Sequence, residues 1–293
     1  MPPNKKFRLK LPSQTLVLGE RTLLMGILNV TPDSFSDGAK YDQPEIAVEH
    51  AIAMERAGAD LLDIGGESTR PGSAEIPASE ELNRILPVLE GLRGKLKIPI
   101  SVDTRRAAVA ELAIRAGAQV INDVSGLKYD PRIAEIAAKY GVPLILTHMR
   151  GEPRTMQKGS FARDVVLDVI KGLRDSAAKA RKAGVARSQI VVDPGIGFGK
   201  GHAQNYELLR KLPRLASLGY PLLVGTSRKG FLGATLARDG KPAAPNQRIW
   251  GTAAAVTASI LGGAHIVRVH DVAEMAQVVR VADRIAFPEM RSR

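Results

Sequence analysis

The sequence predicts an α/β fold, a closed (β/α)8 TIM barrel preceded by a short N-terminal β-hairpin. Short apolar segments alternate with segments of helical periodicity, and this order indicates the strands of a parallel sheet. The apolar segments do not alternate between polar and apolar residues, which indicates that both faces of the sheet are buried. Eight such units in about 250 residues fit a closed barrel, whereas an open doubly wound sheet more often has about five or six strands.

The elements follow in a regular order. In residues 1–22, the stretch FRLKLPSQTLVLGERT alternates imperfectly and predicts a hairpin that closes the floor of the barrel. One pattern then recurs: a helix end, a turn of small residues, a short apolar strand and a polar strand end. The expected strands lie in LLMGILN, ADLLDIGG, IPISVDT, AQVINDVSG, VPLILTHM, QIVVDPG, PLLVGTS and HIVRVHD. We expect the helices to stop at glycines in the left-handed conformation, at Gly58, Gly117, Gly141, Gly184 and Gly263.

Composition limits the class of protein. The 293 residues, 44% hydrophobic and 25% charged, suit one globular domain over residues 1–293. No apolar run reaches the length of a membrane span and no leader pattern is seen, so we expect a cytoplasmic protein without membrane contact. The chain has no cysteine, which removes disulfides, thiolate metal sites and thiol nucleophiles.

The formal charge of +12 raises the question of nucleic-acid binding. The basic residues are scattered, however, and aromatic residues make up only 4% of the chain, so neither a basic patch nor a stacking surface is visible. We therefore interpret the charge as a solvated basic surface, which would also attract an anionic small substrate.

Polar residues stand at or just after the end of every expected strand. In a barrel these ends meet on one face, where active sites lie. Asp103, Asn122 and Asp193 follow strongly apolar strands, and because burial makes an unpaired carboxylate costly, a functional role is favoured over simple contact with water. These residues could bind the edge of a flat, nitrogen-rich heterocycle. Lys229, Arg268 and His270 are expected on the opposite side of the mouth, where they suit an anion.

Seven motifs in order resemble those of dihydropteroate synthase. They are NVTPDSFSDG, GGESTRPGS, SVDT, INDVSG, DPGIGFGK, SRKGF and RVHD, and the resemblance runs from Leu23 to Asp271. It implies a TIM-barrel transferase of folate biosynthesis, a sulfonamide target, that condenses 6-hydroxymethyl-7,8-dihydropterin pyrophosphate with p-aminobenzoate. The products are 7,8-dihydropteroate and pyrophosphate, and Mg²⁺ assists.

The resemblance also assigns individual residues. For the pterin these are Asp103, Asn122, Asp193 and Lys229. For the pyrophosphate they are Asn29, Thr69, Arg70, Arg268 and His270, with Asn29 also assigned to Mg²⁺. For p-aminobenzoate they are Phe35, Thr69, Pro71, Phe198 and Ser227. The residues expected to act in catalysis are Asp103, Asp193, Lys229, Arg268 and His270.

Two other functions remain open at this point. A methyltetrahydrofolate-dependent methyltransferase would share the Asp and Asn set but would not need the cationic clamp. A catalytically silent pterin-binding paralogue would keep the pocket but would be expected to lose the loop motifs, which are intact here. The Ala-rich last helices, around residues 251–263 and 271–285, could offer an apolar face for a homodimer.

Overall fold

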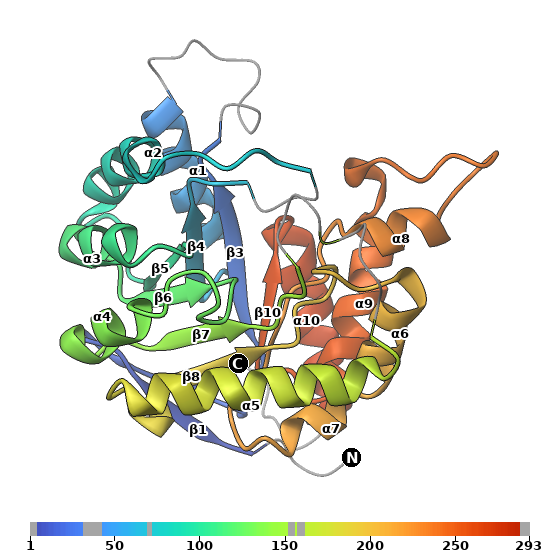
Figure 1. The fold of residues 1–293 in the computed structure, drawn as a ribbon. Coiled ribbons are helices and arrows are strands. Elements are labelled where there is room, and N and C mark those ends of the chain that lie inside the picture. The colour runs from blue at the N-terminus through green and yellow to red at the C-terminus, as the bar shows by residue number, and fades with distance from the viewer. Residues whose placement is uncertain (1–4, 32–42, 69–71, 152–155, 157–161, 288–293) are drawn as a thin grey trace.

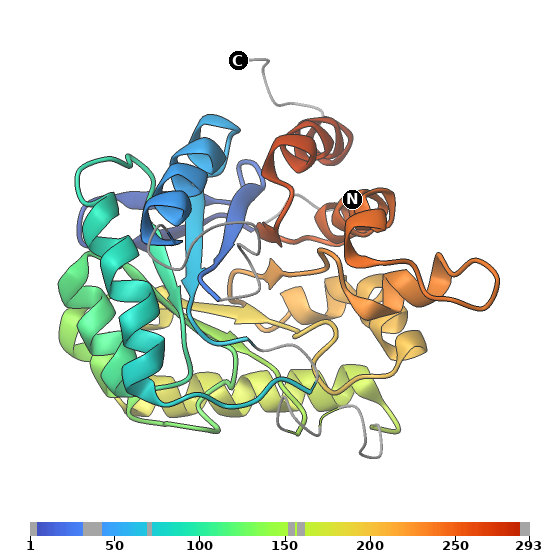
Figure 2. The same cartoon turned by 90° about the horizontal axis from the view of Figure 1, so that it is seen from above.

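Eight parallel strands form the centre of the computed structural model, which describes residues 5–31, 43–68, 72–151, 156 and 162–287. The strands are β3 (Leu23–Asn29), β4 (Leu61–Gly65), β5 (Ile100–Asp103), β6 (Val120–Asp123), β7 (Leu144–Thr147), β8 (Ile190–Asp193), β9 (Leu223–Val224) and β10 (Ile266–Val269). They pair in the order β8-β7-β6-β5-β4-β3-β10-β9. A parallel bridge between Val192 and Leu222 joins the two ends of this order, so the sheet closes on itself (Figure 2).

Helices surround the strands, as Figure 1 and Figure 2 show. They are α1 (Gln43–Arg56), α2 (Ala78–Leu92), α3 (Ala107–Ala116), α4 (Ile133–Tyr140), α5 (Val165–Lys182), α6 (His202–Arg210), α7 (Leu212–Ala216), α8 (Gly230–Thr235), α9 (Ile249–Leu261) and α10 (Val272–Ala286). Outward-facing strand residues such as Leu62 and Ile64 share one buried cluster with Ile85 and Leu89 of α2. The predicted (β/α)8 barrel is therefore confirmed.

Left-handed glycines end the helices where the sequence placed them. The backbone φ angle is +106° at Gly58, +121° at Gly117, +63° at Gly141, +101° at Gly184 and +95° at Gly263. A residue without Cβ adopts such angles without a steric penalty, and this lets the chain turn directly from each helix into the next strand.

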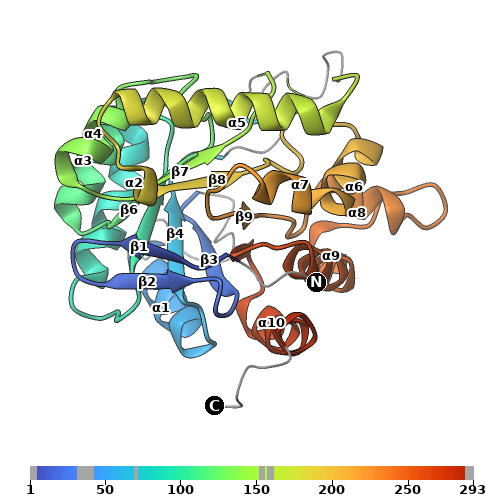
Figure 3. The ribbon, with the colours of Figure 1, turned by 90° about the horizontal axis from the view of Figure 1, so that it is seen from below.

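The N-terminal segment forms the expected hairpin. β1 (Phe7–Lys10) pairs with β2 (Thr15–Leu18) in antiparallel register, with Phe7 opposite Leu18. Leu9 and Leu18 are buried in one cluster with interior barrel residues such as Met25. The hairpin thus closes the bottom of the barrel, where Figure 3 shows both strands lying across the floor.

No helix in the described ranges combines the length and apolarity that crossing a membrane would require.

Candidate active site at the barrel mouth

The carboxyl ends of the strands bring distant polar residues to one end of the barrel. In the parallel register, Asp103 lies beside Asn122 of the next strand, and Asp193 lies beside Thr147. Asp103, Asn122 and Asp193 are all buried. The structure therefore groups the three side chains that the sequence proposed for a heterocycle.

Arg268 lies among these carboxylates. Its Nε donates to Asp63 Oδ2 at 2.6 Å and its Nη2 donates to Asp103 Oδ2 at 2.7 Å. The expectation that Arg268 would stand on the opposite side of the mouth is therefore wrong. The reason is the strand register, because Arg268 pairs with Met25, whose side chain lies in the barrel interior. The Arg268 side chain therefore also starts inside the barrel, and it reaches the nearest buried negative charges.

Burial sets the electrostatics of this group. Burial would lower the pKa of Arg268, but the carboxylates of Asp63 and Asp103 outweigh it and raise that pKa. Burial raises the pKa of Asp103 to about 7 despite Arg268, and it raises the pKa of Asp193 to about 6 although Gly195 N–H donates to Asp193 Oδ1 at 2.7 Å. Both carboxyl groups thus titrate close to neutral pH, as functional carboxylates often do.

Lys229 and Phe198 form the next part of the mouth. The ammonium of Lys229 lies 4.1 Å from the centre of the Phe198 ring, within the range of a cation–π contact. Burial, with a contribution from Arg268, lowers the pKa of Lys229 to about 8. An ammonium that titrates this close to neutrality loses its charge in mildly alkaline solution.

The loop that carries Phe198 is held by Lys200, a residue that the sequence analysis missed. Its side chain is only 2% exposed, and its ammonium donates to the carbonyl oxygens of His148, Gly195 and Phe198 at 3.0, 2.8 and 2.9 Å. These carbonyls belong to the segments after β7 and β8, so Lys200 joins two neighbouring loops of the mouth. The lysine of DPGIGFGK gave no sequence signal beyond its place in a glycine-rich loop.

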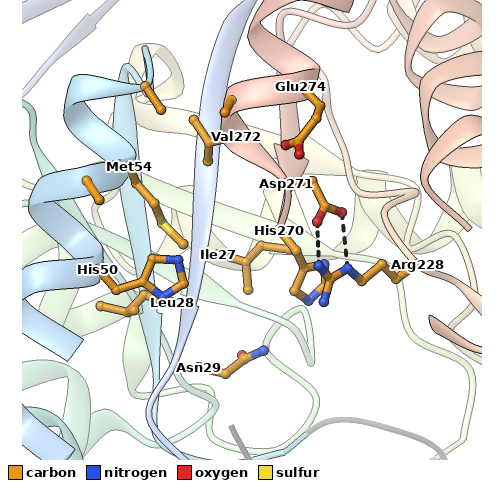
Figure 4. Close-up of a pocket in the computed structure, with 13 residues that line it drawn as sticks. Ile27, Leu28, Asn29, His50, Met54, Arg228, His270, Asp271, Val272 and Glu274 are labelled. Carbon is orange, nitrogen blue, oxygen red and sulfur yellow. Dashed lines mark hydrogen bonds and ion pairs between the residues drawn. The ribbon is translucent and has the colours of Figure 1, made fainter. Parts of the chain in front are cut away.

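His270 and Ser227 meet on the other side of the mouth. Ser227 Oγ lies 3.0 Å from His270 Nδ1 and accepts a hydrogen bond from the His270 backbone N–H at 3.2 Å. Beside them is a cavity of about 480 Å³, in which Asn29 at the end of β3 faces His270 (Figure 4). His50 of α1 also points into this cavity, and Arg228 binds Asp271 there through two hydrogen bonds.

Asn29 is the residue that the family resemblance assigned to Mg²⁺. The described ranges contain no group of three or more His, Asp or Glu side chains that could hold a metal ion. Mg²⁺ often takes only one or two oxygen ligands from a protein and the rest from phosphates and water, so a half-buried amide oxygen at the anion side fits such an ion.

Four of the predicted site residues, Phe35, Thr69, Arg70 and Pro71, lie outside the described residues. Conversely, Asp63 is central to the site but was not among the predicted residues. Its signal was a single carboxylate inside the apolar strand LLDIG.

Comparison with known proteins agrees with this geometry. A family model described as "Pterin binding enzyme" matches residues 25–270. A dihydropteroate synthase of Synechocystis sp. (strain ATCC 27184 / PCC 6803 / Kazusa) is 48% identical over 267 residues, which are 91% of each chain. The solved structure of the Xanthomonas albilineans dihydropteroate synthase with 4-aminobenzoic acid superposes with a TM-score of 0.89 at 41% identity, covering 97% of this chain and 99% of that one. The same enzyme in complex with 7,8-dihydropteroate gives a TM-score of 0.85 at 40% identity, covering 96% and 99%.

Proposed function

The chain belongs to the dihydropteroate synthase family of pterin-binding enzymes, and from this premise we propose how its residues carry the reaction. The reaction condenses 6-hydroxymethyl-7,8-dihydropterin pyrophosphate with p-aminobenzoate and yields 7,8-dihydropteroate and pyrophosphate. The observation that supports this proposal most is the convergence of Asp103, Asn122, Asp193 and Lys229 at one end of the barrel. Beside them the buried Ser227 contacts the half-buried His270.

The buried carboxylates suit the pterin ring. A carboxylate accepts two N–H bonds from an amino-pyrimidine edge, and Asp193 has one oxygen already oriented by the Gly195 N–H. Lys229 supplies a donor for a carbonyl of the pterin ring. The Phe198 ring positions the Lys229 ammonium through the cation–π contact. We assign p-aminobenzoate to the neighbourhood of Phe198 and Ser227.

The step itself is a substitution at the methylene carbon of the pterin. The bond from this carbon to the pyrophosphate oxygen breaks, the negative charge leaves with pyrophosphate, and the aryl amine forms the new C–N bond and then loses a proton. Asp103 and Asp193 stabilise the positive charge that develops on the ring. His270 and Asn29 face the departing anion, and the second terminal nitrogen of Arg268, which is not used by Asp63 or Asp103, is available to it.

Asn29 would hold Mg²⁺ beside the pyrophosphate. When bound there, the ion would neutralise charge on the leaving group. The protein itself orients the pyrophosphate through Asn29 and His270.

We also propose that the chain forms a homodimer through α9 and α10. Trp250 of α9 is 81% exposed, and Val281 and Ile285 of α10 are exposed as well, which leaves large apolar side chains on two helices that pack against each other. Light scattering at several concentrations tests this, and a monomer at all of them would contradict it. The cytoplasmic location remains a prediction.

The decisive experiment measures pyrophosphate release with the pterin pyrophosphate in the presence and absence of p-aminobenzoate. Release that depends on p-aminobenzoate is expected. A methyltransferase would release none, and a silent paralogue would bind the pterin without turnover.

A further inference from the structure

Asp63 is a fully buried carboxylate in the middle of β4, 0% exposed. Its Oδ2 accepts two hydrogen bonds, from Asn122 Nδ2 at 2.8 Å and from Arg268 Nε at 2.6 Å. One oxygen atom therefore ties together a residue assigned to the pterin and the cation that also binds Asp103. Such an atom is placed to orient both partners.

The contact with Asp63 decides which way the amide of Asn122 points. A carboxylate paired with a guanidinium accepts hydrogen bonds and does not donate them, so the amide must turn its NH₂ group toward Asp63. The amide oxygen of Asn122 consequently lies at the other end of the side chain. This assignment follows from the chemistry of the partner and does not depend on distinguishing oxygen from nitrogen in the amide.

The Asn122 oxygen is itself an unsatisfied acceptor. Asn122 is only 2% exposed, and its Oδ1 has no hydrogen-bond partner among the residues that the structure describes. A buried acceptor without a partner is destabilising unless a water or a ligand donates to it. The Asn122 oxygen is thus an acceptor that calls for an N–H group.

We propose that Asp63 is a positioning residue that selects the ligand's hydrogen-bonding pattern by holding the Asn122 amide with its oxygen toward the ring. The inference rests on the proposed function, because it takes the ring to be a pterin. Together with Asp103 and Asp193, the fixed Asn122 oxygen makes one wall of the pocket an array of acceptors. This wall favours a 2-amino-4-oxopteridine, whose amino group donates, over a 2,4-dioxopteridine, whose carbonyl at the same place accepts.

The test compares the affinities of 6-hydroxymethylpterin and of its 2,4-dioxo analogue by calorimetry. In Asp63→Ala no acceptor faces Asn122, so its amide is free to rotate and to turn its NH₂ toward a carbonyl. We expect the ratio of the two affinities to fall about tenfold, which is the scale of one mispaired buried hydrogen bond. An unchanged ratio in a folded Asp63→Ala variant would overturn the proposal.

Asp60, just before β4, provides a matched control. Its carboxylate also pairs with an arginine, because Arg21 donates two hydrogen bonds to it, but this pair lies near the floor of the barrel. Asp60→Ala therefore removes an ion pair away from the mouth and should leave the ratio unchanged. A fall of the same size in Asp60→Ala would mean that general loosening, and not the orientation of Asn122, changes the preference.

If Asp63→Ala does not fold, Asn122→Leu gives the second test, because it removes the orphan oxygen and leaves the Arg268–Asp63 pair in place. The ratio should fall again, and an unchanged ratio would overturn the proposal. The proposed function has a separate failure: a wild-type protein that binds neither ring is not a pterin enzyme. A wild-type protein that prefers the pterin, with variants that keep the preference, refutes only the role of Asp63.

Discussion

Arg268 and Asp103, which are 165 positions apart in the chain, form a buried ion pair at 2.7 Å. Their side chains are only 16% and 9% exposed. One oxygen of Asp103 is therefore already in use before any ligand enters, and the pterin side and the anion side of the mouth share a residue. A change on one side must affect the other.

Arg268→Ala should accordingly weaken binding of both ligands and also destabilise the fold. Its removal leaves Asp63 and Asp103 buried without their counter-charge, which costs about 3–5 kcal/mol of unfolding free energy. Denaturant unfolding measures this loss, and calorimetry with a pterin and with pyrophosphate measures the two affinities. Arg21→Ala, which breaks a more exposed pair with Asp60, is the control and should cost about 1 kcal/mol or less. If Arg268→Ala loses affinity for pyrophosphate but keeps its affinity for the pterin, the prediction is contradicted, and the pterin and the anion bind on separate sides of the mouth.

Asp193→Asn should keep the fold and lose the pterin. The amide oxygen of the new side chain can still accept the Gly195 N–H, so the loop after β8 stays in place. An amide cannot accept two N–H bonds from the ring, and the unpaired donor costs about 1–3 kcal/mol of binding free energy. Calorimetric titration with a pterin analogue, alongside an unfolding curve, distinguishes the two effects. Unchanged affinity would refute the assignment of Asp193.

Lys200→Met should lower both stability and the affinity for p-aminobenzoate. Methionine fills a similar volume but leaves the His148, Gly195 and Phe198 carbonyls without a donor, each at a cost of about 1 kcal/mol or more. Because the Phe198 backbone is one of the three, the ring under Lys229 loses its support. Lys211→Met removes a half-exposed lysine that forms an ion pair with Glu207, and it is the control for unfolding in denaturant. Equal denaturation midpoints for the two variants would mean that Lys200 does not stabilise the loops after β7 and β8.

The fold could be predicted from local patterns because every strand–helix unit of the barrel shows the same two sequence signals. A strand buried on both faces is apolar throughout, and a glycine such as Gly117 is needed wherever a helix must turn back at once into the sheet. Both signals lie within a few neighbouring residues, so they can be read without knowing what packs against them. The candidate residues at strand ends followed from the same logic, since a closed barrel brings those ends to one face.

The partners within the site depend on contacts between distant segments. Arg268 was expected opposite Asp103, but whether it reaches the carboxylates depends on its register beside Met25. Asp63 was overlooked as a site residue because a carboxylate within a strand reveals nothing of the amide and guanidinium that converge on it. Lys200 was overlooked for the same reason, since its three acceptors are backbone oxygens, which every residue carries.

The pKa shifts at the mouth predict a bell-shaped dependence of pterin binding on pH. Burial raises the pKa of Asp193 to about 6, so the carboxylate that receives the ring is charged only above that pH. Burial lowers the pKa of Lys229 to about 8, so its ammonium is lost above that value. Affinity should therefore rise through about pH 6, stay high near neutrality and fall through about pH 8.

Stability should respond to the titration of Asp193 with the opposite sign. Because the folded-state pKa of Asp193 lies above its ordinary value of 3.8, the contribution of this group to the unfolding free energy is full below pH 3.8 and is lost as pH rises through about 6. In Asp193→Asn that part of the pH dependence of stability should disappear, and denaturant midpoints between pH 4 and pH 7 measure it.

Lys229→Arg isolates the alkaline limb of the binding profile, because a guanidinium stays charged throughout the range. The fall in affinity through about pH 8 should vanish in this variant, while the rise through about pH 6 remains, since Asp193 is untouched. Titration of a pterin analogue from about pH 5 to about pH 9 gives both limbs in one series. An alkaline limb that persists in Lys229→Arg would assign it to a group other than Lys229, and the ammonium over the Phe198 ring would then have no part in holding the pterin.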